Sequence, residues 1–162
     1  MRTLILGLGN PIRGDDAVGL QVAEALRRDM PPRADIEVDV DYEGGLRLME
    51  SLVGYDRAII IDAICTGSNP PGTILRLGPH DLPTQHSASA HDMNLPTELQ
   101  LAATMGLHVP QTITIFAIEA RSIMDFDDRL TPAVAAAVPL AVAAVLEFVG
   151  QASTTDALRA RS

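Results

Sequence analysis

The stretch that decides the fold is Thr3-Leu4-Ile5-Leu6-Gly7-Leu8, a short apolar run closed by glycine. It does not alternate polar and apolar residues, which is typical of a strand buried on both faces of a sheet. A turn over residues 7–16 follows, and apolar residues then recur at helical spacing from Val18 to Met30. A buried strand, a tight turn and an amphipathic helix in this order predict the first unit of an α/β fold.

Strands and helices alternate along the rest of the chain. Ala58-Ile59-Ile60-Ile61-Asp62-Ala63 reads as a second fully apolar strand that ends at Asp62. Further strands are expected at residues 36–40, 72–77 and 112–118, and further helices at 46–53, 95–105 and from 132 onward. We predict an α/β protein, a single three-layer domain with a mostly parallel, twisted sheet of about five strands flanked by helices. It should cover residues 1–150, and the polar residues 151–162 should form a loose C-terminal tail.

The composition excludes several classes of function. The chain of 162 residues has a net charge of −9, and all 12 of its basic residues are arginine. An acidic surface argues against nucleic acid and anionic membrane as partners. Because there is no lysine, Walker A loops, Schiff-base lysines and Ser–Lys dyads are excluded. The single cysteine excludes intrachain disulfides and cysteine-based zinc sites, and it is compatible with the cytoplasm.

Two apolar segments bear on membranes and targeting. The run that follows Met1 is too short for a signal peptide and has no small-residue cleavage site. Residues 133–146 are apolar but fall short of the ~20 residues that a membrane helix needs. We therefore expect a cytoplasmic protein without a membrane partner, in which residues 133–146 belong to a packed helix.

Acidic residues stand where a parallel sheet places its site, at the carboxyl ends of the strands. Asp62 ends one strand, where it is either a site carboxylate or a turn residue that accepts backbone hydrogen bonds. Asp15 and Asp16 follow another strand, and since one of them suffices to cap a helix, the other is available to the crevice. A dinucleotide fingerprint is not favoured here, because Ile12 stands where the third glycine is needed.

Histidine and cysteine give weaker signals. The segment 78–93 has no clear period and contains His80, His86 and His91, and nothing local distinguishes His91 from its neighbours. Cys65 is either a small buried hydrophobe or a nucleophile that lacks the surroundings of known cysteine proteases. From the residues alone, the chain is an acidic α/β domain with a carboxylate-lined crevice.

Four segments together resemble the nickel–iron hydrogenase maturation endopeptidases, in the family's order and spacing. They are Leu6-Gly7-Leu8-Gly9-Asn10-Pro11-Ile12-Arg13-Gly14-Asp15-Asp16-Ala17-Val18-Gly19, then Glu43-Gly44-Gly45, Ile59-Ile60-Ile61-Asp62-Ala63-Ile64 and Ser89-Ala90-His91-Asp92. The first segment alone is not specific, because peptidyl-tRNA hydrolases open similarly. The resemblance covers roughly residues 1–150.

This resemblance implies a hydrolase, an aspartic-type endopeptidase that trims the C-terminal extension of the hydrogenase large-subunit precursor after nickel insertion. The family's metal-binding positions fall on Asp16, Asp62 and His91, and the nickel is brought by the substrate, so no catalytic metal of its own is expected. Two carboxylate oxygens and one imidazole nitrogen suit nickel, which is a borderline divalent ion. Asp16, Asp62 and Glu43 are the implied catalytic residues, with Glu43 helping in cleavage or in gripping the substrate. The implied protein is a monomer.

Two other functions are compatible with parts of the pattern. A binding module could check the metal content of the same partner with Asp16, Asp62 and His91 and not cleave it. An esterase similar to peptidyl-tRNA hydrolases should carry basic patches for tRNA, and a net charge of −9 disfavours them.

Overall fold

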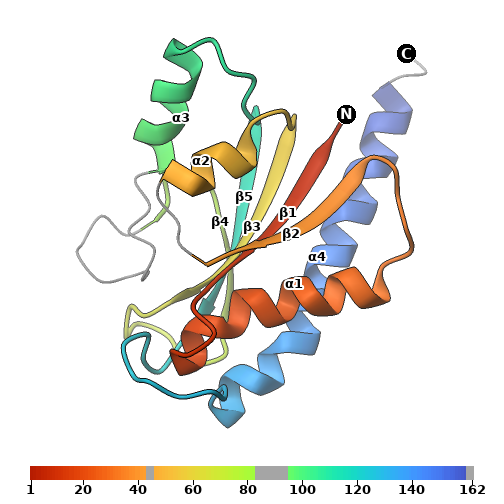
Figure 1. The fold of residues 1–162 in the computed structure, drawn as a ribbon. Coiled ribbons are helices and arrows are strands. Elements are labelled where there is room, and N and C mark those ends of the chain that lie inside the picture. The colour runs from red at the N-terminus through yellow and green to blue at the C-terminus, as the bar shows by residue number, and fades with distance from the viewer. Residues whose placement is uncertain (43–45, 83–94, 160–162) are drawn as a thin grey trace.

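The computed structural model describes residues 1–42, 46–82 and 95–159. They form one sheet of five strands in the order β2-β1-β3-β5-β4, with helices on both faces (Figure 1). The strands are β1 (Thr3–Leu8), β2 (Ile36–Asp41), β3 (Arg57–Ile64), β4 (Ile74–Leu77) and β5 (Thr112–Glu119). The helices are the 3₁₀ turn η1 (Gly14–Ala17), α1 (Val18–Asp29), α2 (Leu46–Leu52), α3 (Leu95–Thr104) and α4 (Pro132–Arg159). The predicted single α/β domain with a mostly parallel sheet is confirmed.

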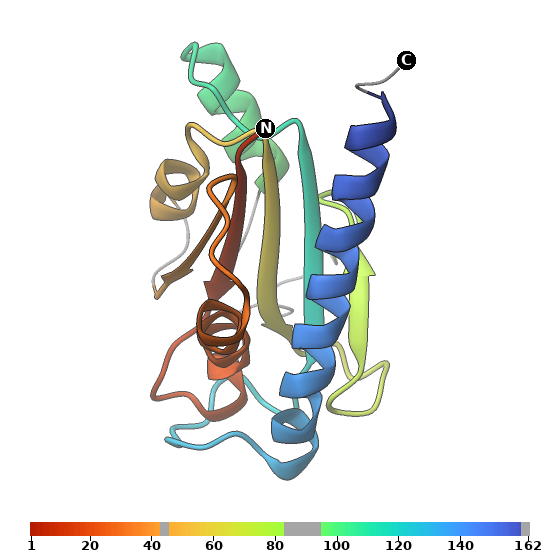
Figure 2. The same ribbon diagram turned by 90° about the vertical axis from the view of Figure 1, so that its right-hand side faces the viewer.

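Two aliphatic cores lie on the two faces of the sheet. On one face, Ile5, Ile59 and Ile61 pack against α1 and α4. On the other, Leu4, Leu6 and Ile60 pack against α2 and the start of α3. Figure 2 shows the resulting three layers, with α2 and α3 on one side of the strands and α4 along the other. Both β1 and β3 are buried at every position, which explains why neither alternates polar and apolar residues.

The strand order creates a switch point between β1 and β3. From β1 the chain crosses through α1 to β2 on one side, and from β2 it crosses through α2 on the opposite face to β3. The two crossovers cover opposite faces of the sheet, and in parallel sheets of this kind the site is expected at the carboxyl ends of the strands beside such a switch point, here β1 and β3. This edge is at the bottom of Figure 1, where η1, the start of α4 and the segment 120–131 gather.

Glycines allow the first crossover to lie directly on the sheet. A Cβ at Gly19 would overlap the carbonyl oxygens of both Leu8 and Ile61, and a Cβ at Gly7 would overlap the carbonyl of Gly19. A Cβ at Gly9 would likewise overlap the carbonyl of Asp16. The beginning of α1 therefore sits in backbone contact with β1 and β3, which brings η1 against the carboxyl end of β3.

Two elements differ from the sequence expectations. β3 continues to Ile64, so Asp62 lies inside the strand rather than at its end, because pairing with β5 extends to Ile64 and Glu119. β4 is antiparallel to β5 and forms an edge of the sheet. Its apolar residues carry no signal of direction, which is why the sequence predicted a strand there without its orientation.

α4 is longer than the sequence analysis expected. Pro139 lies inside the helix without ending it, and helix continues to Arg159 through residues assigned to a loose tail. No glycine or proline follows Gly150 there, and an existing helix extends readily through such residues. The side chain of Gln151 also bonds that of Glu147 one turn earlier, at 3.0 Å. The predicted boundary at residue 150 is therefore not the end of the helix.

By length and composition, α4 is the one helix among the described residues that could cross a membrane. Its stretch Pro132–Gln151 has a mean hydropathy of 2.1 and is 28% buried. The buried residues Val134, Ala137, Ala141 and Val145 form a stripe that packs on the sheet and α1. A core helix passes the same test, so the absence of a membrane partner stays a prediction.

We predict that Gly19→Ala destabilises the fold by about 1–3 kcal/mol or more, because the new methyl group meets backbone atoms that cannot rotate away. Urea unfolding followed by circular dichroism measures the change in unfolding free energy. Gly150→Ala is the matched control: its Cβ meets open space on α4, and alanine there should be neutral or stabilising by up to about 1 kcal/mol. An unchanged midpoint for Gly19→Ala would contradict the close approach of α1 to the sheet.

Candidate functional site

Asp16 and Asp62 belong to the two segments that meet at the switch point. Asp16 lies in η1, the next element after β1, and Asp62 lies two residues before the end of β3. Their residues are 0% and 2% exposed. An Asp16 carboxylate oxygen accepts a hydrogen bond from the Asn10 N–H at 3.0 Å, and an Asp62 oxygen accepts one from the Ala63 N–H at 2.8 Å. Each bond orients a carboxylate at the carboxyl edge of the sheet.

Strand alternation assigns Asp62 to the face covered by α2 and α3. Ala58, Ile60 and Ile64 have the same parity on β3, and all three belong to the core on that face. Leu95, the first residue of α3, is buried in the same core. Leu82, the last described residue before α3, packs against it as well. Leu82 and Leu95, the described residues nearest in sequence to His91, therefore lie on the face of Asp62.

Two predicted site residues cannot be compared with the structure. Glu43 and His91 lie outside the described residues. Within residues 1–42, 46–82 and 95–159, no group of three His, Cys, Asp or Glu side chains is arranged to hold a metal ion. The structure thus brings the segments of Asp16 and Asp62 to one edge, and the role of His91 as the third ligand stays a prediction.

Asp15, next to Asp16, has a structural role that sequence reasoning missed. Its carboxylate accepts the backbone N–H of Thr131 at 2.7 Å and that of Arg121 at 3.1 Å, and it also bonds the Thr131 hydroxyl. These bonds tie η1 to the start of α4 and to the loop before it. The expectation that one residue of the pair caps the helix it precedes is wrong, since neither η1 nor α1 has a side-chain cap.

Glu119 holds a second loop at the same edge. It ends β5, is buried, and accepts hydrogen bonds from the backbone N–H groups of Thr66 and Gly67 at 2.8 and 2.9 Å. The Thr66 hydroxyl bonds both of its carboxylate oxygens. This anchors the chain after β3. An acidic residue directly after the apolar strand TITIFAI is the signal that could have revealed it, as it did for Asp62.

Comparison with known proteins decides the family. The sequence model of the HycI family, hydrogenase maturation protease, matches residues 20–148. The Hydrogenase 2 maturation protease of Escherichia coli K12 is 30% identical over 148 residues, 90% of this chain and 89% of that protein. The chain belongs to the hydrogenase maturation proteases. It is therefore a hydrolase of a family whose role is the C-terminal processing of the hydrogenase large subunit.

Solved structures of relatives have the same fold as this protease. The hydrogenase maturating endopeptidase HybD from E. coli superposes with a TM-score of 0.81 at 28% identity, covering 94% of each chain. The [NiFe] hydrogenase maturation protease HybD from Thermococcus kodakarensis gives 0.70 at 26% identity, covering 91% of this chain and 99% of that one. The resemblance inferred from four sequence segments is thus confirmed across nearly the whole chain.

Cys65 is a poor nucleophile for the protease. Burial, and then the negative charges of Glu119 and Asp15, raise the pKa of its thiol. A nucleophilic cysteine needs the opposite shift, since the thiolate is the reactive form. Its Sγ lies 3.7 Å from the Arg121 carbonyl oxygen, to which the protonated thiol can donate. Cys65 therefore reads as a packing residue, the first of the two sequence alternatives.

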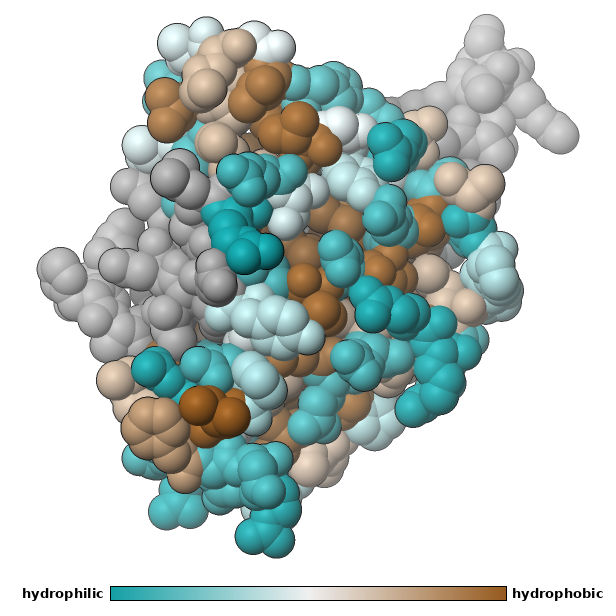
Figure 3. Space-filling view, viewed as in Figure 1, coloured by the Kyte–Doolittle hydropathy of each residue, from teal (hydrophilic) through white to brown (hydrophobic). Residues whose placement is uncertain are grey.

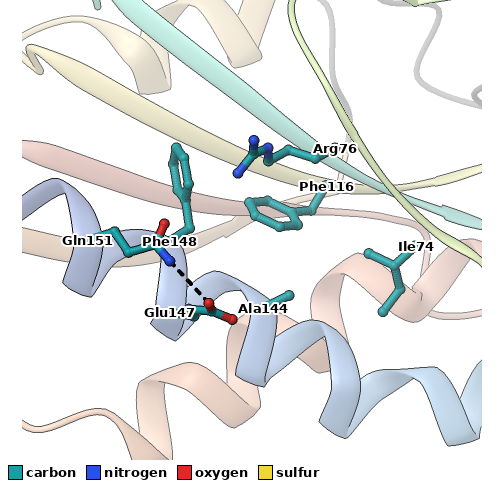
Figure 4. A pocket seen from close by; sticks show the side chains of 7 residues that line it. All are labelled: Ile74, Arg76, Phe116, Ala144, Glu147, Phe148 and Gln151. Carbon is teal, nitrogen blue, oxygen red and sulfur yellow. Dashed lines mark hydrogen bonds between the residues drawn. The ribbon is translucent and has the colours of Figure 1, made fainter.

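A cavity of about 380 Å³ lies on the other side of the sheet from Asp62. Phe116 and Phe148 meet edge to face in it with ring centroids 5.8 Å apart, and the Arg76 guanidinium lies 5.4 Å from the Phe148 ring (Figure 4). Its lining is Ile74, Arg76, Phe116, Ala144, Glu147, Phe148 and Gln151. Because Phe116 faces α4, this cavity is separate from the carboxylate edge.

We predict that Asp15→Asn lowers the unfolding free energy by about 1–3 kcal/mol. The Asp15 carboxylate accepts the backbone N–H groups of Arg121 and Thr131, and the NH₂ group of an asparagine would face one of these donors and could not accept from it. Asp125→Asn, on the exposed loop nearby, is the control and should change stability little. Equilibrium urea unfolding of the two variants measures the difference. Equal stability of Asp15→Asn and wild type would contradict a stabilising role for the hydrogen bonds of Asp15.

Proposed function

We propose that this protease removes the C-terminal extension of a nickel-loaded hydrogenase large-subunit precursor and uses the bound nickel to recognise it. The observation that carries the proposal is the pair Asp16 and Asp62, two buried carboxylates on the segments that meet at the switch point. Buried carboxylates are costly unless they are paired, hydrogen-bonded or bound to a cation. A cation delivered by the substrate suits such a pair.

The donor set fits nickel as part of the substrate. Asp16 and Asp62 would supply oxygens, and His91 would supply an imidazole nitrogen, a mixed set suited to a borderline divalent ion. The hydrogen bonds from the Asn10 and Ala63 N–H groups would orient the two carboxylates as ligands. Three donors on separate segments bind a free ion weakly because ordering them costs entropy. Nickel already held by substrate thiolates would need only these donors to complete its shell.

In this proposal the nickel positions the precursor tail for hydrolysis. Water adds to the carbonyl carbon of the scissile peptide bond, a carboxylate accepts its proton, and the proton passes to the leaving amine as the C–N bond breaks. The enzyme is then an aspartic-type endopeptidase, with Glu43 as the acidic side chain that assists cleavage or grips the substrate. Positioning supplies much of the rate, since a bound tail makes the attack effectively unimolecular. The protease acts as a cytoplasmic monomer.

Asp62→Asn should reduce processing by ~100-fold or more, the scale of losing a charge-stabilising group in an active site. The fold should survive, because the amide oxygen can still accept the Ala63 N–H. Intact-mass measurement of nickel-loaded precursor over time gives the rate, and thermal melting checks the fold. Asp29→Asn, at the far end of α1, loses the same charge and should process normally. Wild-type processing by Asp62→Asn would exclude Asp62 from the mechanism.

Cleavage should depend on nickel bound to the precursor and not on metal added to the enzyme. Nickel-free precursor should stay intact even with millimolar zinc, because the protease donors alone hold a free ion weakly. The same mass assay, run on nickel-loaded and nickel-free precursor, measures this. Equal cleavage of both would show recognition of the peptide alone. A stable complex with loaded precursor and no cleavage would instead identify a metal-checking binding module.

A further inference from the structure

Three large apolar side chains beside η1 are exposed to solvent. Ile12, Met124 and Phe126 are 57%, 67% and 77% exposed and lie on two loops at the carboxyl edge of the sheet. We call them the apolar edge patch. Single exposed apolar residues are ordinary, but a group of them marks an interaction surface. Figure 3 shows hydrophobic side chains together at the lower left corner of the molecule, bordered by hydrophilic ones.

Backbone hydrogen bonds join the two loops of the patch. The Asp127 N–H donates to the Ile12 carbonyl at 3.2 Å, and the Gly14 N–H donates to the Asp127 carbonyl at 2.7 Å. Arg13 and Asp127 form a parallel β-bridge between these bonds. The Arg13 guanidinium lies 5.8 Å from the centre of the Phe126 ring. Phe126 is therefore held beside Ile12 by the fold.

The hydrogen bonds of the buried Asp15 carboxylate fix the same loops. It binds Arg121 and Thr131, the residues near the two ends of the loop that carries Met124 and Phe126. The positive φ of Gly14, 52°, turns the chain from the β-bridge into η1, so that the patch and Asp16 belong to one short, fixed segment. A surface ordered before binding loses little entropy on association.

Charged residues of both signs surround the patch. Asp125, Asp127 and Asp128 are all exposed on the loop of Phe126. Three arginines offset them: Arg13 over the Phe126 ring, and the exposed Arg121 and Arg129 on the same loop. An apolar centre with such a rim is complementary to an apolar area of a partner that is also bordered by charges of both signs.

We propose that the apolar edge patch docks the folded body of the hydrogenase large-subunit precursor, at an apolar area of its surface that lies near its C-terminal tail. This rests on the proposed function. The patch is continuous with the catalytic edge, because Ile12 precedes Asp16 by four residues on the segment fixed by Gly14 and Asp15. A protein held there presents its nearby C-terminal tail to the crevice between β1 and β3. The docked body thus adds a contact that a tail alone lacks.

The test measures precursor binding and processing by the double variant Ile12→Ser/Phe126→Ser. We expect the Kd for nickel-loaded precursor, and the KM for its cleavage, to rise about tenfold or more, as for loss of an aromatic anchor. The value of kcat should stay within about twofold, because the nickel-binding donors are untouched. Leu140→Ser, 63% exposed on α4, is the matched control and should leave KM unchanged. Met124→Ser gives a second, milder variant, and thermal melts confirm folding.

Unchanged Kd and KM in the double variant would overturn the docking proposal while leaving the proposed function intact. If wild type binds the nickel-loaded precursor without cleaving it, and the double variant does not bind it, the docking proposal would be supported and the proposed function overturned. A wild-type dimer that the double variant abolishes in sedimentation would show instead that the patch joins two copies of this chain.

Discussion

The close approach of α1 to the sheet is the constraint on which the rest of this protease depends. Gly19 touches the backbone of both β1 and β3, and Gly7 and Gly9 make room for the turn between them. Without these contacts η1 could not reach the end of β3, and Asp16 would lie away from the strand of Asp62. The glycines of this segment thus serve backbone packing and do not surround a phosphate, which agrees with the failure of the dinucleotide pattern at Ile12.

Four of the buried acidic residues at the carboxyl edge divide into two roles. Asp15 and Glu119 accept several hydrogen bonds each from loop backbone and hydroxyl groups, and so hold the segments around the crevice. Asp16 and Asp62 each accept a backbone N–H and are the carboxylates that the proposal assigns to nickel. Their neighbours in sequence do not separate the roles, because Asp15 and Asp16 are adjacent. The role of Asp15 follows from the segments that it joins, the start of α4 and the loop before it.

Much of the fold could be predicted because its signals are local. The apolar runs at residues 4–8 and 58–61 indicate burial on two faces, and the glycine-containing turn after the first run indicates the crossover. The antiparallel direction of β4 and the hydrogen bonds of Asp15 and Glu119 depend on contacts between segments from about 40 to more than 100 residues apart, which leave no local pattern. Asp62 was located by its position after a strand of isoleucines, although the strand continues two residues further. Glu43 and His91 were assigned from the family resemblance alone, and they lie outside the described residues.

In the proposed function, Asp16 and Asp62 act on one nickel ion brought by the precursor. A double-mutant cycle on the affinity for nickel-loaded precursor tests it most directly, because binding is measurable even when cleavage is lost. Asp16→Asn, Asp62→Asn and the double variant would be compared with wild type by calorimetry. If both carboxylates hold the same ion, each single change weakens binding and the double variant is scarcely weaker than the worse of the two. A shared nickel ion would be contradicted if the fold-losses in affinity of the two single variants multiply in the double variant. Equal losses of affinity for nickel-free precursor would contradict it as well.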